Sequence, residues 1–409
     1  MEVFVARQAI LNRQKGLYGY ELLFRSDPDK NSFDGSDGSF ATTQVIANTL
    51  FSAGLESILG GKKAFINFDR QMLLDGAYSI LHKETLVIEI LESVEPDDEV
   101  VKACGRLKEC GFTLALDDFV SHPKYEPMVK KAQFIKVDVQ STPRREQQRL
   151  VAIYGKRGIR MLAEKVETLE EFEWALQVGF DFFQGYFFTK PVVVRGRQIS
   201  TSKMSCLRLL QETQREEIDF DKLRALINGD VSFSYKLLHF TNSALFANQT
   251  EVRTIEHALI VLGEDGIRRW GAIAALPGLA KDKPHELIVH SLLRAQFSER
   301  LGRLAQIVTA QNCFLMGLFS LLDTLLDRTI EYALQQIKLA PSVEAALLGT
   351  AASDDRMAIV YSLIRFYEAG DWVKVNHLAK RLDLPVSAIG EAYLESARWV
   401  AEVTGAGCA

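Results

Sequence analysis

Polar side chains stand at the ends of short apolar runs throughout the first half of the chain. The runs include KAFINF, LVIEIL, FIKVDV and RMLAEK, and they are rich in the β-branched and aromatic residues typical of strands. A charge buried in such a run costs several kcal/mol unless it is paired or bound to a metal ion, so its repeated placement indicates one shared site. The residues concerned are Glu21, Asn67, Glu89, Asp117, Asp118, Lys136, Glu164 and Gln184.

This set combines carboxylate and amide oxygens with one lysine, which points to chemistry with a hard cation. Mg²⁺ and Mn²⁺ take oxygen ligands, whereas Zn²⁺ takes mostly histidine and cysteine. An eight-fold α/β barrel builds its active site from residues at the ends of successive strands, all of which meet at one mouth. The pattern therefore predicts a metal-dependent active site on a TIM-like α/β barrel.

The elements that would position these residues alternate between strand-like and helical sequence over residues 1–192. Helical stretches at 43–59, 98–110 and 168–178 separate the strand-like runs, and the polar segment 26–39 is typical of an exposed loop. This alternation predicts βαβ units and a parallel sheet.

Strand parity predicts which side chains face the site. In FIKVDV the odd and even positions separate into two faces, one with Phe134, Lys136 and Asp138 and the other with Ile135 and Val137. We expect the first face to line the barrel mouth and the second to pack under the helices.

The pattern changes near Lys190 and Pro191. The segment VVVRGRQIS, at 192–200, is typical either of a last strand or of a linker. Beyond it, segments such as CLRLLQET, KLRALIN and SYKLLHFTN have the apolar spacing of helices. We therefore predict a barrel over 1–192, a linker over 193–202 and an all-α domain over 203–409.

Bulk properties exclude several classes of partner. The 409-residue chain has a net charge of −5, which gives no reason to expect binding to nucleic acid or to an anionic membrane. Its apolar runs are too short to cross a bilayer, and it begins without a signal-peptide pattern. Five cysteines without CxxC spacing predict free thiols. We therefore expect a cytoplasmic protein.

Taken in order, the motifs make residues 1–192 resemble the EAL domain, the bacterial barrel that hydrolyses cyclic di-GMP. The naming tripeptide stands as Glu21, Leu22 and Leu23, with leucine in place of alanine, and Arg25 follows. The segments FINF, IEILES, LALDDF, FIKVDV, AEKVET and FFQGYFFTKP match the later motifs of that family. Each motif is weak alone, but the ordered set is specific.

The resemblance implies a role for each matching residue around two Mg²⁺ or Mn²⁺ ions. The implied metal ligands are Glu21, Asn67, Glu89, Asp117 and Asp118. The implied catalytic residues are Lys136, Glu164 and Glu167, and the implied substrate-binding residues are Arg25, Gln184 and Asp138. The substrate would be cyclic di-GMP and the product linear pGpG. For Asp138 and Glu92, the interpretation as structural charges that hold loops is equally open.

Two departures from the family pattern bear on activity. Active members carry a glycine-rich stretch of the form DFGTGYS after the double aspartate, where this chain has Val120 and His122 in place of both glycines, followed by Pro123. Glycine permits backbone angles that these residues do not. Related barrels pair through this region, so the resemblance implies that a homodimer is possible, but the sequence does not fix the oligomeric state. The second departure is Lys165, which replaces a glycine and puts a cation beside Glu164.

The helical half resembles the HD-related output domain. The residues that carry this resemblance are the segments NGDVS, LLHFTNSALF and IEHALIVLG. Related metal phosphohydrolases place a His-Asp pair where this chain has Ser320 and Leu321, and Ser291 follows the lone His290. The resemblance therefore implies a non-catalytic domain that acts on an unknown signalling protein. Two hypotheses remain open: a weak or regulated phosphodiesterase, and a catalytically inactive sensor or scaffold.

Overall fold

The computed structural model describes residues 4–25, 59–75, 82–190, 201–242 and 252–405. The segments 26–39 and 192–200, and nearly all of the helix expected at 43–59, lie outside these ranges. The chain forms two compact units. One unit contains residues 1–190 together with 363–409, and the other contains residues 191–362.

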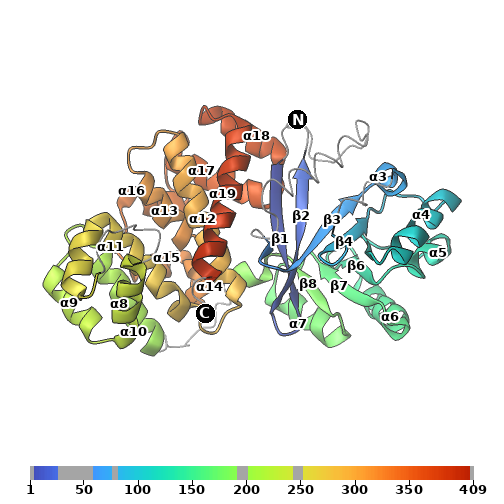
Figure 1. The fold of residues 1–409 in the computed structure, drawn as a ribbon, viewed down its shortest axis with the longest axis horizontal. Helices are drawn as coiled ribbons and strands as arrows, with labels where there is room; N and C mark the ends of the chain where they lie inside the picture. Colours follow the sequence, from blue (N-terminus) through green and yellow to red (C-terminus); the bar gives the residue numbers. More distant parts are fainter. Residues whose placement is uncertain (1–3, 26–58, 76–81, 191–200, 243–251, 406–409) are drawn as a thin grey trace. The chain divides into compact units, whose positions relative to one another are not determined.

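The first unit is built on a closed barrel whose strands β1 to β8 follow one another in chain order (Figure 1). The strands are β1 (Phe4–Asn12), β2 (Leu17–Arg25), β3 (Lys63–Phe68), β4 (Leu86–Ile90), β5 (Thr113–Leu116), β6 (Phe134–Asp138), β7 (Arg160–Glu164) and β8 (Phe182–Gln184). This confirms the barrel fold class.

The expected parallel sheet holds from β2 to β8, but β1 runs antiparallel to both of its neighbours. The turn between β1 and β2 is too short for the crossover that parallel strands need. Asn12 holds this turn, because its Oδ1 accepts hydrogen bonds from the backbone N–H groups of Gln14 and Gly16 at 3.0 and 2.9 Å.

Helices cover the outside of the barrel. They are α3 (Arg70–Leu74), α4 (Asp98–Glu109), α5 (Glu126–Val129), α6 (Arg144–Tyr154) and α7 (Leu169–Val178). Three of them, α3, α4 and α7, begin at a side-chain cap. Asp97 caps α4, and Thr168 forms a capping box with Glu171 at the start of α7. The two expected helices near 98–110 and 168–178 are therefore confirmed to within about one residue.

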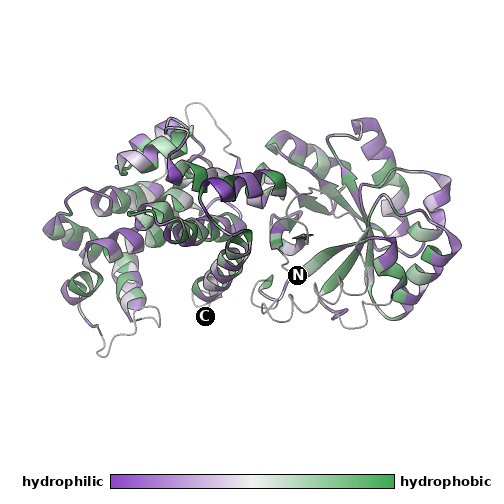
Figure 2. Cartoon of the chain, turned by 90° about the horizontal axis from the view of Figure 1, so that it is seen from above, coloured by the Kyte–Doolittle hydropathy of each residue, from purple (hydrophilic) through white to green (hydrophobic). Residues whose placement is uncertain are grey.

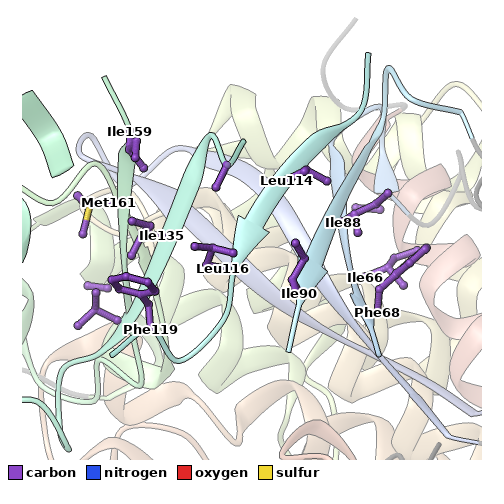
Figure 3. Packing of buried hydrophobic residues seen from close by; sticks show 14 of the residues in the cluster. Ile66, Phe68, Ile88, Ile90, Leu114, Leu116, Phe119, Ile135, Ile159 and Met161 are labelled. Atoms are coloured by element: carbon purple, nitrogen blue, oxygen red, sulfur yellow. The ribbon is translucent and has the colours of Figure 1, made fainter. Parts of the chain in front are cut away.

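Side-chain alternation divides the barrel into an inner and an outer layer. One buried ring fills the interior: Ile10, Phe65, Val87, Ala115, Phe134, Leu162 and Phe182. The alternate residues, such as Ile66, Ile88 and Ile135, pack in the larger outer core (Figure 3). Figure 2 accordingly colours the strands as mostly hydrophobic and the surrounding helices as mixed. The parity expected for Phe134 and Ile135 is confirmed.

The last helices of the chain belong to the barrel unit. They are the end of α17 (Arg356–Glu368), α18 (Trp372–Arg381) and α19 (Val386–Gly405). The buried Tyr367 hydroxyl donates a hydrogen bond to the Val5 carbonyl at 3.1 Å, and the Arg7 N–H donates to the Tyr393 hydroxyl at 3.2 Å. Both contacts hold strand β1. Whether residues 203–409 fold by themselves stays a prediction, because 363–409 group with the barrel.

The second unit is helical, as expected. Its helices are α8 (Thr201–Thr213), α9 (Phe220–Asn228), α10 (Val231–Thr241), α11 (Ile255–Leu279), α12 (His285–Leu304), α13 (Ala310–Phe319), α14 (Leu322–Leu326), α15 (Ile330–Gln335), α16 (Pro341–Leu348) and the start of α17. Gly263, at φ 60°, breaks α11 where the HALIVLG segment ends. Within the described ranges, no helix is long and apolar enough to cross a membrane.

The residues at the expected His-Asp position are buried in this unit. Ser320 donates a hydrogen bond to the Gly317 carbonyl at 2.7 Å and accepts one from Arg294 at 3.0 Å. Leu321 is also buried. A Cβ at Gly317 would lie 2.3 Å from the Arg294 carbonyl oxygen, so α12 and α13 approach closely there.

We expect Tyr367→Phe to destabilise the barrel unit by about 1–3 kcal/mol, because the Val5 carbonyl loses its buried donor. Urea unfolding gives the size of the effect, and hydrogen exchange of the peptide covering 4–12 locates it. The control is Tyr235→Phe, because Tyr235 is exposed. If β1 exchanges at the wild-type rate in Tyr367→Phe, the C-terminal helices do not hold this strand.

Candidate active site at the barrel mouth

The inner face of the barrel carries a polar layer above the apolar ring. On β3 to β7, the residue two positions after each ring member is polar: Asn67 after Phe65, Glu89 after Val87, Asp117 after Ala115, Lys136 after Phe134 and Glu164 after Leu162. On β8, Gln184 follows Phe182 in the same way. Because the alternation is that of a strand, the apolar ring forms the floor under these residues.

Lys136 lies at the centre of this layer and is fully buried. Its Nζ is 2.8 Å from Glu89 Oε1, from Asp117 Oδ1 and from Glu164 Oε1. It is 3.3 Å from Glu21 Oε2. One ammonium group therefore faces four carboxylates, each from a different strand or strand end.

Amide side chains hold Glu21 in place. Asn67 Nδ2 donates to Glu21 Oε1 at 3.0 Å, and Gln184 Nε2 donates to Glu21 Oε2 at 2.6 Å. Gln184 Nε2 also donates to Gln8 Oε1 at 2.7 Å. Gln8 lies in none of the motifs that predict the site, although its parity with Ile10 of the interior ring places it on the inner face.

The four carboxylates around Lys136 differ in the direction of their pKa shifts. Burial, together with the neighbouring carboxylates, raises the pKa of Glu89 well above its usual value. Burial likewise raises the pKa of Glu164 and of Asp117, with Lys136 offsetting part of the effect. Burial also opposes the charged form of Glu21, but Lys136 and the amide donors lower its pKa below the usual value. The four carboxylates therefore share one buried ammonium group, and burial disfavours the ionised forms of Glu89, Asp117 and Glu164.

Whether a metal ion fits can be judged from the buried oxygen atoms around Lys136 and from Asp118 beside them. Those without a hydrogen-bond donor among the described residues include Asn67 Oδ1, Glu89 Oε2, Asp118 Oδ1, Glu164 Oε2 and Gln184 Oε1. Such oxygens cost about 1–3 kcal/mol each when unsatisfied, and they are the ligands that Mg²⁺ and Mn²⁺ prefer. The donor chemistry at Glu21, Asn67, Glu89 and Asp117 therefore fits a hard divalent cation.

The carboxylates are nevertheless not arranged around such an ion. In the part of the chain that the structure describes, no group of three or more acidic, histidine or cysteine side chains could hold a metal as it stands. The cause is geometric, since Glu89, Asp117 and Glu164 each direct one oxygen to Lys136. An ion at this position would have to draw these oxygens away from Lys136.

A second group of charged residues, formed by Lys165, Asp118 and Asp138, lies at the same ends of the strands. Lys165 Nζ is 2.7 Å from Asp138 Oδ2 and 3.3 Å from Asp118 Oδ2. The other oxygen of Asp138 accepts hydrogen bonds from the backbone N–H groups of Gln140 and Ser141. Partial burial opposes the charged form of Asp138, but the Lys165 ammonium and these two backbone bonds together lower its pKa. The backbone bonds also favour the interpretation of Asp138 as a residue that holds a loop, while a substrate contact stays a prediction.

The remaining expected residues lie apart from the Lys136 cluster. Glu167 is half-exposed and pairs with Lys190 at 2.7 Å. Arg25 ends β2, and its side chain lies outside the part of the chain that is described. Glu92 is exposed just beyond β4.

Glycine is required at one position near the site. Gly185, at φ 144°, follows Gln184, and a Cβ there would lie 2.1 Å from the Val166 carbonyl oxygen. The Val166 N–H also donates to the Gln184 carbonyl at 3.0 Å. This close approach joins the AEKVET and FFQGYFF segments and so fixes the separation of Glu164 and Gln184.

The segment that lacks the two glycines has a defined conformation. His122 Nδ1 accepts a hydrogen bond from the Lys124 N–H at 3.2 Å and caps the short helix η3 (Pro123–Tyr125). Lys124 pairs with Glu95 at 2.9 Å, and Val120 is 71% exposed. The Phe119 N–H donates to the Lys136 carbonyl at 3.0 Å, so this loop begins against the strand that carries the central lysine.

Comparisons with known proteins identify similar chains. The EAL domain model matches residues 67–191, and the HDOD domain model matches residues 200–347. "Uncharacterized protein YuxH" of Bacillus subtilis is 35% identical over 407 residues, covering 98% of both chains. "Cyclic di-GMP phosphodiesterase CdgJ" of Vibrio cholerae is 33% identical over 404 residues, covering 98% of this chain and 93% of its own.

Solved structures are also similar to part of this chain. The calcium and cyclic di-GMP complex of BlrP1 from Klebsiella pneumoniae is 24% identical, with a TM-score of 0.38. That match covers 46% of this chain and 55% of BlrP1.

Substitutions of Lys136 and of Glu89 should have different effects on the free energy of unfolding. Without metal, we expect Lys136→Met to cost about 3–5 kcal/mol, because it leaves buried carboxylates without their partner. Glu89→Gln keeps the side-chain shape but removes one buried negative charge, so the free energy of unfolding should stay the same or rise.

Urea unfolding in EDTA measures both substitutions. Lys124→Met is the matched control, because its ammonium pairs with Glu95 at the surface and its loss should matter little. Equal unfolding midpoints for Lys136→Met and Lys124→Met would contradict the central role of Lys136.

Proposed function

The chain belongs to the family of proteins that join an EAL domain to an HDOD domain, and we propose that its barrel binds cyclic di-GMP and hydrolyses it to linear pGpG. The observation that carries the proposal is the convergence of Glu21, Glu89, Asp117 and Glu164 on Lys136 at one barrel mouth. The relative CdgJ, named a cyclic di-GMP phosphodiesterase and similar over nearly the whole chain, supports the choice of substrate.

The proposed reaction is attack of water on one phosphodiester, with a new phosphorus–oxygen bond forming as the bond to the ribose oxygen breaks. The ribose oxygen would leave as a hydroxyl group after it takes a proton from solvent water. Glu21, Asn67, Glu89 and Asp117 would hold a Mg²⁺ or Mn²⁺ ion. When bound, that ion would supply Lewis-acid polarisation of the phosphoryl oxygen and a more acidic water. Arg25 and Gln184 would contact the substrate.

Two residues would handle the proton and the charge. Glu164 is buried and has a raised pKa, which suits a general base that takes the proton of the attacking water. Lys136 would orient that water and stabilise negative charge that develops on the phosphoryl group. Glu167 would support Glu164 from the adjoining segment.

The second candidate function is a sensor or scaffold that binds the nucleotide without turnover. Two observations favour it: the pairing of Asp118 with Lys165, and the capped loop without glycines. In either case, we propose that the helical domain acts through its surface on an unidentified signalling protein, and that the barrels pair as a homodimer.

The deciding experiment incubates the full chain with cyclic di-GMP and Mn²⁺ or Mg²⁺, followed by nucleotide chromatography and calorimetry. Appearance of pGpG supports the enzyme, whereas tight binding without product supports the sensor. Neither binding nor turnover would contradict both candidate functions.

We expect Glu21→Gln to lower the rate of hydrolysis more than about 100-fold, because Glu21 would bind the metal ion directly. Loss of a residue that only contacts a metal ligand already costs about 10- to 100-fold in affinity or activity. Chromatography of the nucleotide products measures the rate. Glu146→Gln, a change on the exposed surface of α6, is the matched control and should hydrolyse like wild type. Full activity in Glu21→Gln would remove this residue from the site.

Restoring the two glycines tests the altered loop. We expect the double variant Val120→Gly/His122→Gly to raise hydrolysis several-fold in the presence of metal, because the loop regains backbone freedom beside Asp117 and Asp118. His122→Ala is the control, since it removes the η3 cap without adding that freedom. If the glycine variant and the control have the wild-type rate, the loop does not limit activity.

A further inference from the structure

Lys165 has a backbone conformation that a lysine rarely adopts. It follows the last residue of β7 directly and lies in the left-handed region at φ 55°. Asp118, its partner, is also left-handed at φ 38°. Strained residues of this kind persist where surrounding contacts hold them, and they concentrate at functional sites.

The contacts of Lys165 explain what holds it. Its Nζ lies 2.7 Å from Asp138 Oδ2 and 3.3 Å from Asp118 Oδ2, so it joins the ends of two neighbouring strands. Its carbonyl accepts a hydrogen bond from Gln140 Nε2 at 3.0 Å. Although the side chain is 52% exposed, both the backbone and the ammonium group of Lys165 have fixed partners.

We propose that the Lys165 ammonium is a tethered cation that takes the place of a second divalent ion, so that the barrel binds one fewer metal ion than its double aspartate would otherwise allow. This inference rests on the proposed function, because that function places a divalent ion at Asp117, the residue directly before Asp118. Asp118 has one oxygen beside the ammonium, and its other oxygen is buried without a donor among the described residues.

Electrostatics keeps the two cations apart. A divalent ion bound to Asp118 would lie within a few ångströms of the ammonium, where like charges repel strongly and solvent screens them incompletely. The ammonium is covalently attached, so it is always present at the site. It can donate hydrogen bonds to a phosphate oxygen, but it has no coordination position for water. An ammonium group in place of a divalent ion therefore favours the binding of a phosphodiester over the activation of water at this position.

The Mn²⁺ stoichiometry of the full chain tests this inference without any activity measurement. Electron paramagnetic resonance of free Mn²⁺ gives the number of ions bound per chain. We expect Lys165→Met and Lys165→Gly each to bind one more Mn²⁺ than wild type. Lys165→Met removes only the charge, whereas Lys165→Gly also relieves the backbone strain, so a folding defect in one variant leaves the other to decide.

Controls separate the site from general charge effects. Lys165→Arg keeps the charge and should bind as many Mn²⁺ ions as wild type. Lys124→Met also removes one partly exposed positive charge, but it lies against Glu95, and its Mn²⁺ count should not change. Adding Asp118→Asn to Lys165→Met should abolish the gained ion.

The inference is overturned if Lys165→Met and Lys165→Gly bind the wild-type number of ions, or if the gained ion persists after Asp118→Asn. Its failure is distinguishable from failure of the proposed function. Wild-type protein that neither binds nor hydrolyses cyclic di-GMP would contradict the function, while the Mn²⁺ count would still decide the role of Lys165.

Discussion

The buried ammonium group of Lys136 is the interaction on which the upper layer of the barrel depends. It contacts carboxylates from β2, β4 and β7 and from the end of β5, so one side chain links strands that are distant in sequence. The apolar ring beneath it excludes water from below, which makes each unpaired charge costly. Attraction to Lys136 and the cost of leaving a charge buried without a partner thus hold these carboxylates in place.

Local periodicity was enough to predict much of this arrangement. Phe134 and Lys136 on one face, with Ile135 on the other, follow from the two-residue repeat of a strand. The barrel fold and the helical second half follow from the change between that repeat and the helical one. The convergence of Glu89, Asp117 and Glu164 follows because carboxyl ends of parallel strands meet at one mouth.

Features that depend on partners distant in sequence could not be predicted in the same way. The antiparallel direction of β1 is set by the short turn after Asn12, and nothing in the repeat of β1 records it. The packing of Tyr367 and Tyr393 on β1 joins residues more than 360 positions apart. The pairing of Lys165 with Asp118 requires left-handed backbone at both residues, whereas propensity favours glycine there.

β1 and the helices that cover it are far apart in the sequence, and this separation has a consequence during synthesis of the chain. Val5 leaves the ribosome 362 residues before Tyr367, and Arg7 leaves it 386 residues before Tyr393. The backbone groups of β1 can therefore meet these tyrosines only after more than 360 further residues have been synthesised. Until then β1 exposes apolar surface that later becomes core, and a nascent chain in that state is prone to aggregate. The covering of β1 in the barrel unit thus depends on helices that are synthesised long after the strand itself.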